Sequence, residues 1–281
     1  MGSFRDFLGG HQVTSFFVFT FVFSWYFWGA AASIPESRDL YLTLGRFGPT
    51  VVGLALIYLF KGREGIRDIF SKMVAWRVNP LFYVFAIFGT ALIVVPAIFV
   101  GTYLGGTGNS WNDPSQWYMI FVTFGYVLFF SVLGEELGWR GFALPRIQRD
   151  AVALVSSLVL GLVWGLWHVP LWFVPGDFHQ SLSLPIFLLQ TMGFSVLYTW
   201  LYNNTGGSLL ITGLFHAASN TTLGLLPVLP MDTGGDTLPM LISVGLLWVI
   251  VAVVTVAYGP TYLSRDEKNT LFGGFSWEYE D

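Results

Sequence analysis

Long apolar runs alternate with short polar connections along the whole chain. A helix needs about 20 mostly apolar residues to cross the hydrocarbon core of a bilayer, and eight runs approach that length. The pattern therefore predicts an all-α polytopic membrane protein, folded as a single transmembrane domain over residues 1–281. The expected spans are Thr14–Ala32, Leu42–Phe60, Leu81–Tyr103, Trp117 onward, Val152–Val169, Leu184–Tyr202, Ser208–Leu226 and Pro239–Tyr258.

The composition agrees with a protein of the cell membrane. Hydrophobic residues make up 54% of the chain and charged residues only 11%, against roughly 25% charged residues in a soluble domain. A net charge of −4 without a basic patch excludes nucleic acid as a partner. The chain has no cysteine, which excludes disulfides, thiolate metal ligands and a cysteine nucleophile.

The first span resembles a signal peptide, because the sequence GAAAS at Gly29–Ser33 is similar to a cleavage site. Its apolar stretch is longer than the 7–15 residues of a signal peptide, and only Arg5 precedes it. We therefore expect this span to be retained as a helix.

Lysine and arginine gather in every second connection, after the second and fourth spans and in the tail. The positive-inside rule then predicts that both termini are cytoplasmic, with Arg38 and Arg46 as the only exceptions. Residues 62–78 place apolar side chains at helical spacing among basic ones, which predicts an amphipathic helix on the inner leaflet, a solvated loop being the alternative. Residues 259–281 are polar and are expected to form a cytoplasmic tail.

The fourth span contains three ionisable residues within the sequence GEELGWRGF, Gly134–Phe142. An ionisable side chain at bilayer depth costs about 2.5–3.5 kcal/mol, so such residues usually serve function. Glu136 and Arg140 are spaced i,i+4, which predicts an ion pair. Glu135 points about 100° away around the helix and has no local partner. It is the first candidate for a functional group.

Two histidines lie inside predicted spans, His168 in the fifth and His216 in the seventh, and Asn220 follows His216 by one helical turn. In a hairpin that turns near Ala151, Glu135 and His168 are equally far from the turn, so we expect these side chains to meet in the inner half of the membrane. His11 and His179 fall in terminal and loop sequence and are interpreted as surface residues.

Small residues also recur on these spans. Gly134, Gly138 and Gly141 share a face of the fourth span, while Gly161 and Gly165 lie on the fifth. Glycine faces let helix backbones approach closely. We therefore expect the two spans to pack closely against each other beside Glu135.

A carboxylate beside a neutral histidine can hold and deprotonate a water molecule. A second histidine and an amide on one helix face can donate to the oxyanion of an attacked carbonyl group. Alternatively, Glu135, His168 and His216 match a three-ligand catalytic zinc site. Both alternatives predict peptide or ester hydrolysis in the membrane. The i,i+4 spacing of His216 and Asn220 favours the first, so no metal or other cofactor is predicted and zinc stays the alternative.

The motifs Glu-Glu-x-x-x-Arg (Glu135, Glu136, Arg140), aromatic-x-x-x-His (Trp164, His168) and His-x-x-x-Asn (His216, Asn220) resemble those of the CPBP family (CAAX protease and bacteriocin-processing, or Abi). Their order is similar to that of type II CAAX prenyl endopeptidases. The resemblance covers about Trp117–Leu226, which would be the catalytic core. It implies an eight-helix membrane fold and a glutamate-dependent intramembrane endopeptidase.

The resemblance also implies roles for these residues. Glu135 would be the general base together with His168, and His216 with Asn220 would form the oxyanion hole. Glu136 and Arg140 would support the site structurally. The second motif usually begins with Phe, and we interpret Trp164 at that place as part of the wall, without a role in the chemistry.

Two other functions stay open from the sequence. One is a non-catalytic membrane scaffold or immunity protein of the same fold. The other is a proton-coupled transporter in which buried Glu and His form a relay, although no inverted repeat supports it. If the chain is a protease, its partners are the bilayer and a peptide or membrane-associated protein. A prenylated C-a-a-X sequence, a peptide leader and a membrane-protein tail are the substrate alternatives.

Overall fold

The computed structural model describes residues 4–106 and 117–265. This part of the chain is an all-helical bundle without strands. Its α-helices are α1 (Phe4–Gly10), α2 (Gln12–Ser33), α3 (Arg38–Arg46), α4 (Gly48–Met73), α5 (Pro80–Tyr103), α6 (Met119–Val127), α7 (Leu133–Gly138), α8 (Leu144–Asp150), α9 (Ala153–Trp167), α10 (Leu184–Asn204), α11 (Leu209–Leu225) and α12 (Leu238–Tyr258). Three 3₁₀ turns, η1 (Pro35–Ser37), η5 (Val169–Phe173) and η6 (Phe178–Ser181), and two π-helical turns, η3 (Leu128–Val132) and η4 (Trp139–Ala143), connect them.

Within the described residues, seven segments are long and apolar enough to cross a membrane. They are Gln12–Ser33, Pro35–Met73, Pro80–Tyr103, Met119–Asp150, Ala153–Phe173, Leu184–Asn204 and Leu238–Tyr258. The remaining expected span forms as α11, a helix of 17 residues, which is shorter than the roughly 20 residues that usually cross a bilayer. The outward faces of the long helices are apolar, with Leu92 68% and Val256 87% exposed. The fold is that of an integral, all-α polytopic membrane protein.

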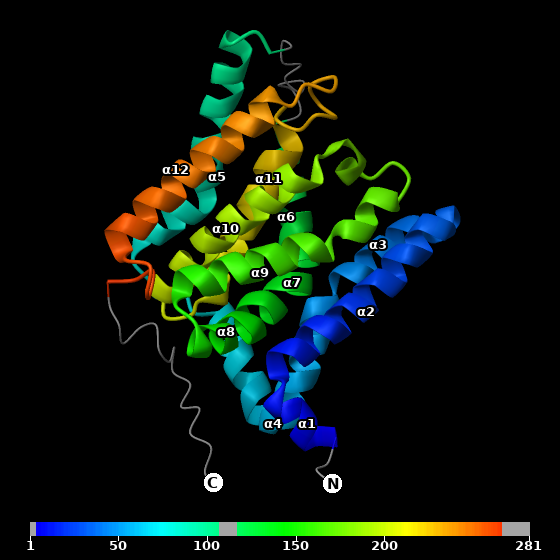
Figure 1. The fold of residues 1–281 in the computed structure, drawn as a ribbon, viewed down its shortest axis with the longest axis vertical. Helices are drawn as coiled ribbons and strands as arrows, with labels where there is room; N and C mark the ends of the chain where they lie inside the picture. Colours follow the sequence, from blue (N-terminus) through cyan, green and yellow to red (C-terminus); the bar gives the residue numbers. More distant parts are fainter. Residues whose placement is uncertain (1–3, 107–116, 266–281) are drawn as a thin grey trace.

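Helices α9, α10 and α11 lie in the middle of the bundle, with α5 and α12 along one side and α2 and α3 along the other (Figure 1). The short helix α7, which carries both glutamates, packs against α4 and touches α11. A π-helical turn lies directly before it and another directly after it. Such turns disturb the regular ladder of helix hydrogen bonds and are frequent at functional sites.

The second expected span differs most from its prediction. Helix α3 ends at Arg46 and α4 begins at Gly48, so the segment is broken near its start, and α4 continues past Phe60 to Met73. A break in helical geometry at Gly62, whose φ is 60° and ψ is −147°, separates the apolar part from the predicted amphipathic part. Ile69 in that part is fully buried in the core. The position of this amphipathic part on the inner leaflet stays a prediction. The cytoplasmic tail also stays a prediction, and its residues 266–281 lie outside the described residues.

The expectation that the glycine faces of the fourth and fifth spans pack against each other is wrong. A methyl group on Gly134 would lie 2.8 Å from the carbonyl oxygen of Arg46, and one on Gly138 would collide with the carbonyl group of Pro49. One on Gly161 would lie 2.6 Å from the Cα of Met192. The glutamate helix therefore packs its glycines against the α3–α4 junction, while α9 packs its own against α10.

Candidate active site

A cavity of about 440 Å³ lies inside the bundle. Four side chains that the sequence proposed for catalysis line it together: Glu135 from α7, His168 at the end of α9, and His216 and Asn220 from α11. Much of the remaining wall is aromatic or aliphatic, including Trp28, Phe187, Phe194 and Leu223. The fold thus gathers distant residues around one cavity of the size of a small-ligand site.

Glu135 is buried and 4% exposed. Its Oε2 accepts a hydrogen bond of 2.9 Å from the indole Nε1 of Trp164. Trp164 lines the cavity, as expected of a wall residue, and it also donates a bond that a phenylalanine at this position could not donate. The expectation that Glu135 has no partner holds only within its own helix, because its partner Trp164 belongs to α9. The second carboxylate oxygen is left for a molecule in the cavity.

Glu136 and Arg140 form the predicted ion pair, with 2.8 Å between Oε1 and Nη1 and both side chains almost fully buried. The same Oε1 accepts a second bond of 2.8 Å from Nδ1 of His216. The guanidinium group of Arg140 also lies 3.9 Å from the ring centre of Tyr198, a cation–π contact. Because a carboxylate accepts and does not donate, the Nδ1 of His216 carries a proton and its Nε2 is the atom left for the cavity.

His168 caps the C-terminus of α9, which cannot continue in α-helical form because Pro170 follows two residues later. Its Nδ1 donates to the carbonyl oxygen of Trp164 at 2.8 Å. A carbonyl oxygen only accepts, so in a neutral His168 the proton resides on Nδ1 and Nε2 is an open acceptor. That acceptor suits a water molecule held beside Glu135.

The interpretation of His179 as a surface residue is wrong. It is 3% exposed, its Nδ1 lies 2.6 Å from Oδ1 of Asp177, and both residues line the cavity. The segment between α9 and α10 folds back over the cavity through η5 and η6, which loop composition alone does not indicate. The signal that could have found it is the Asp-x-His spacing. His11, in contrast, is exposed as expected.

For each residue of this pair, burial and hydrogen bonding shift the pKa in opposite directions. Burial lowers the pKa of His179 below its ordinary value, and the hydrogen bond and charge of Asp177 oppose this only in part. Burial alone would raise the pKa of Asp177, but the hydrogen bonds from His179 hold it below its usual range. At neutral pH the pair is therefore a carboxylate and a neutral imidazole.

The zinc alternative needs three donor atoms that converge on one point. A three-ligand zinc site needs every donor atom within about 2.0–2.2 Å of one ion. In the part of the chain that the structure describes, no three His, Asp or Glu side chains are grouped in a way that could hold a metal ion.

Comparison with known proteins relates the region around the cavity to membrane proteases. Residues 115–222 match the family model described as type II CAAX prenyl endopeptidase, Rce1-like, and this range contains all the motif residues. The chain is also similar to a CAAX prenyl protease 2 of Methanococcus maripaludis, with 26% identity over 259 residues that cover 85% of this chain and 91% of the relative. A weaker similarity, 23% identity over 223 residues, links it to an MFS-type transporter of Pestalotiopsis microspora, of which only 36% is covered.

A helical membrane protein with buried ionisable groups around one cavity and this family match is a hydrolase, an intramembrane protease. The chain resembles the CPBP family of intramembrane endopeptidases, and within that family the type II CAAX prenyl endopeptidases.

Proposed function

We propose that the protein hydrolyses a peptide bond of a membrane-associated substrate inside the cavity, with Glu135 as the base that activates water. One observation carries this proposal: Glu135, His168, His216 and Asn220 come from three helices and line the same 440 Å³ space. The bond from Trp164 leaves one oxygen of Glu135 for a ligand, and His168 offers an open Nε2.

The reaction follows from these two acceptors. A water molecule donates one hydrogen bond to Glu135 and the other to Nε2 of His168. Glu135 takes a proton as the water oxygen attacks the carbonyl carbon of the substrate. The protonated Glu135 then gives this proton to the leaving nitrogen as the C–N bond breaks. The products are a carboxyl group and an amine, and the carboxylate of Glu135 is restored.

The negative charge that develops on the carbonyl oxygen needs hydrogen-bond donors. His216 and Asn220 supply them from one face of α11. Since the Nδ1 of His216 donates to Glu136, its Nε2 donates to the oxyanion only when both ring nitrogens are protonated. Glu136 holds the ring of His216 through the bond to its Nδ1, and Arg140 keeps the carboxylate paired. Glu136 and Arg140 thus support the site without touching the substrate.

The substrate is proposed from the wall of the cavity and from the relatives. Its aromatic and aliphatic lining suits apolar side chains, and the relative named CAAX prenyl protease 2 supports a prenylated C-a-a-X peptide. A peptide leader and a membrane-protein tail are the alternatives. If both termini are cytoplasmic, as the sequence predicts, the site would lie near the inner face of the membrane. The similarity to a transporter supports a proton relay less well than the similarity to a protease supports hydrolysis, because it covers only about a third of that transporter.

The test is product mapping by mass spectrometry with the purified full chain in detergent. Three peptides serve as substrates: a farnesylated peptide that ends in a C-a-a-X sequence, the same peptide without farnesyl, and an apolar leader-like peptide. We expect one new carboxyl terminus on the farnesylated peptide and slower or no cleavage of the other two. Absence of any cleaved product from all three peptides would contradict the proposed function, and preferred cleavage of the leader would contradict the proposed substrate.

A further inference from the structure

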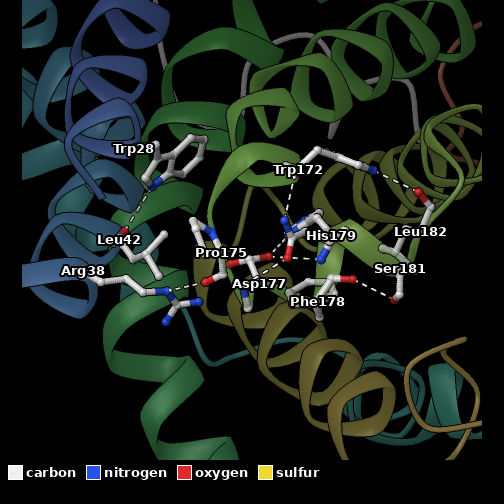
Figure 2. Close-up of polar contacts among 12 residues, drawn as sticks. Trp28, Arg38, Leu42, Trp172, Pro175, Asp177, Phe178, His179, Ser181 and Leu182 are labelled. Carbon is white, nitrogen blue, oxygen red and sulfur yellow. Dashed lines mark hydrogen bonds and ion pairs between the residues drawn. The ribbon is translucent and has the colours of Figure 1, made fainter. Parts of the chain in front are cut away.

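The segment between α9 and α10 is built to hold His179 in place (Figure 2). The indole Nε1 of Trp172 donates to the carbonyl oxygen of Leu182 at 2.9 Å, which closes the segment on itself. The Nε of Arg38 on α3 donates to the carbonyl oxygen of Pro175 at 3.1 Å, which ties it to the neighbouring helix. A segment fixed from both sides can hold a side chain with the accuracy that an active site needs.

Within this segment, one oxygen of Asp177 accepts two hydrogen bonds from His179. The backbone nitrogen of His179 donates at 3.1 Å and its ring Nδ1 at 2.6 Å. A turn needs only the first bond. The second fixes the ring and keeps its proton on Nδ1, although the side chains of His179 and Asp177 are only 4% and 8% exposed. Burial of a carboxylate is costly, so a purely local turn does not explain the pair.

The ring of His179 lies against the ring of His168. Their centres are 5.5 Å apart and their planes differ by 29°. Trp28 is likewise nearly parallel to His168, with 6.1 Å between centres and 25° between planes. The outer torsion of a histidine side chain is intrinsically broad, so one hydrogen bond from Nδ1 leaves the ring free to tilt. These two rings, together with the edge-on rings of Trp167 and Phe187, restrict that tilt.

We propose that His179, held by Asp177, is a positioning residue for His168: its ring fixes the direction in which the Nε2 of His168 faces the cavity. This inference rests on the proposed function, in which that Nε2 holds the attacking water. A shift of about 1 Å in a reacting group can cost about a hundredfold in rate. The rate that depends on a fixed ring of His168 therefore explains why the costly burial of the Asp177–His179 pair is kept.

The charge of His179 matters as well as its shape. The titratable and charged groups that face it are Asp177 on the same segment, His168 on α9 and Arg46 on α3, whereas the α10 side chain against it is Phe187. Because burial lowers its pKa, His179 is neutral at neutral pH. On acidification it gains a proton and places a positive charge beside His168, which lowers the basicity of the Nε2 of His168 and weakens it as the acceptor for the attacking water. We expect activity to fall as His179 becomes protonated.

The experiment compares kcat, KM and pH profiles on the farnesylated C-a-a-X peptide. His179→Ala removes the ring and should lower kcat by about 10- to 100-fold with little change in KM. His179→Phe keeps a ring and should recover most of kcat at neutral pH. The phenylalanine cannot be protonated, so the acid side of the pH profile of this variant should move to lower pH. Asp177→Asn removes the anion that favours the proton on His179 and should move the acid side of the profile in the same direction.

Ser181→Ala is the matched control, because it removes a hydrogen bond of the same segment, to the carbonyl oxygen of Phe178, without touching His179. It should keep both kcat and the pH profile. Wild-type kcat in His179→Ala, or equal loss in His179→Ala and His179→Phe, would overturn the positioning role. If His179→Ala does not fold, unchanged profiles in His179→Phe and Asp177→Asn would overturn it. Activity in Glu135→Gln would instead refute the proposed function, so the two failures are distinguishable.

Discussion

At Trp164 the indole ring has two contacts with the groups of the site. Its Nε1 donates to Glu135 at 2.9 Å, and its ring lies 4.7 Å from the guanidinium carbon of Arg140. The hydrogen bond fixes one oxygen of the carboxylate, while the ring covers the cation that pairs with the neighbouring Glu136. One side chain therefore orients the proposed base and shields its structural partner.

Trp164→Phe keeps an aromatic ring over Arg140 and removes the hydrogen bond to Glu135. A hydrogen bond to a charged group contributes about 1.5–3 kcal/mol, so kcat should fall by about 10- to 150-fold if the bond is needed for the productive carboxylate geometry. Steady-state kinetics on the farnesylated peptide measure this. Trp248→Phe is the control, since its indole donates to the carbonyl oxygen of Leu189 away from the cavity. A wild-type kcat in Trp164→Phe would show that the bond does not serve the reaction.

Of the side-chain bonds within the site, only the local one could be predicted from the sequence. The Glu136–Arg140 pair follows from its i,i+4 spacing, and the structure confirms it. The bond of Glu136 to His216 joins residues 80 positions apart, and that of Glu135 to Trp164 joins residues 29 positions apart. Such bonds depend on how helices pack, which residue spacing does not specify. The catalytic roles of Glu135, His168, His216 and Asn220 stay predictions.

Among the helices, α7 is the element whose position decides the site. Its glycines bring it against the start of α4: Gly138 faces Pro49, and a Cβ on Gly53 would lie 3.1 Å from the Cα of Gly138. The π-helical turns on either side let α7 turn its two glutamates differently from a regular helix. Close backbone packing and local unwinding together place Glu135 at the cavity.

Gly138→Ala should destabilise the protein, because the new methyl group would collide with the backbone of Pro49, which cannot move aside as a flexible side chain would. Overpacking of this kind costs about 1–3 kcal/mol. Thermal unfolding in detergent measures the expected drop in midpoint. Gly125→Ala, where an added Cβ meets nothing within 4 Å, should leave the midpoint unchanged or slightly higher. Equal midpoints for the two variants would contradict the packing of α7 on α4.

The apolar runs predicted the helices well because their length is a direct requirement of the bilayer. What failed at this scale was the choice of packing partner. Gly161 and Gly165 show which face of α9 packs closely, but nothing in their spacing identifies α10 as the neighbour. The break between Arg46 and Gly48 was also missed, since the apolar pattern continues through it.

In the whole molecule, the cavity wall extends beyond the region that the family model matches. Residues 115–222 supply the motif residues, whereas Trp28 and Arg46 come from the N-terminal helices. The similarity to the methanococcal protease covers 85% of the chain and so includes residues outside that region. We therefore propose a single domain in which α2 and α3 complete the site. The cytoplasmic position of the termini stays a prediction.

The most direct test of the account is the turnover of Glu135→Gln. Glutamine has nearly the same shape as glutamate and still accepts the bond from Trp164, but its amide cannot take a proton from water. We expect a thermal midpoint and a peptide affinity close to those of the wild type, with cleavage of the farnesylated peptide reduced to background. Substantial cleavage by a folded Glu135→Gln protein would show that another group activates the water, and would contradict the central role of Glu135.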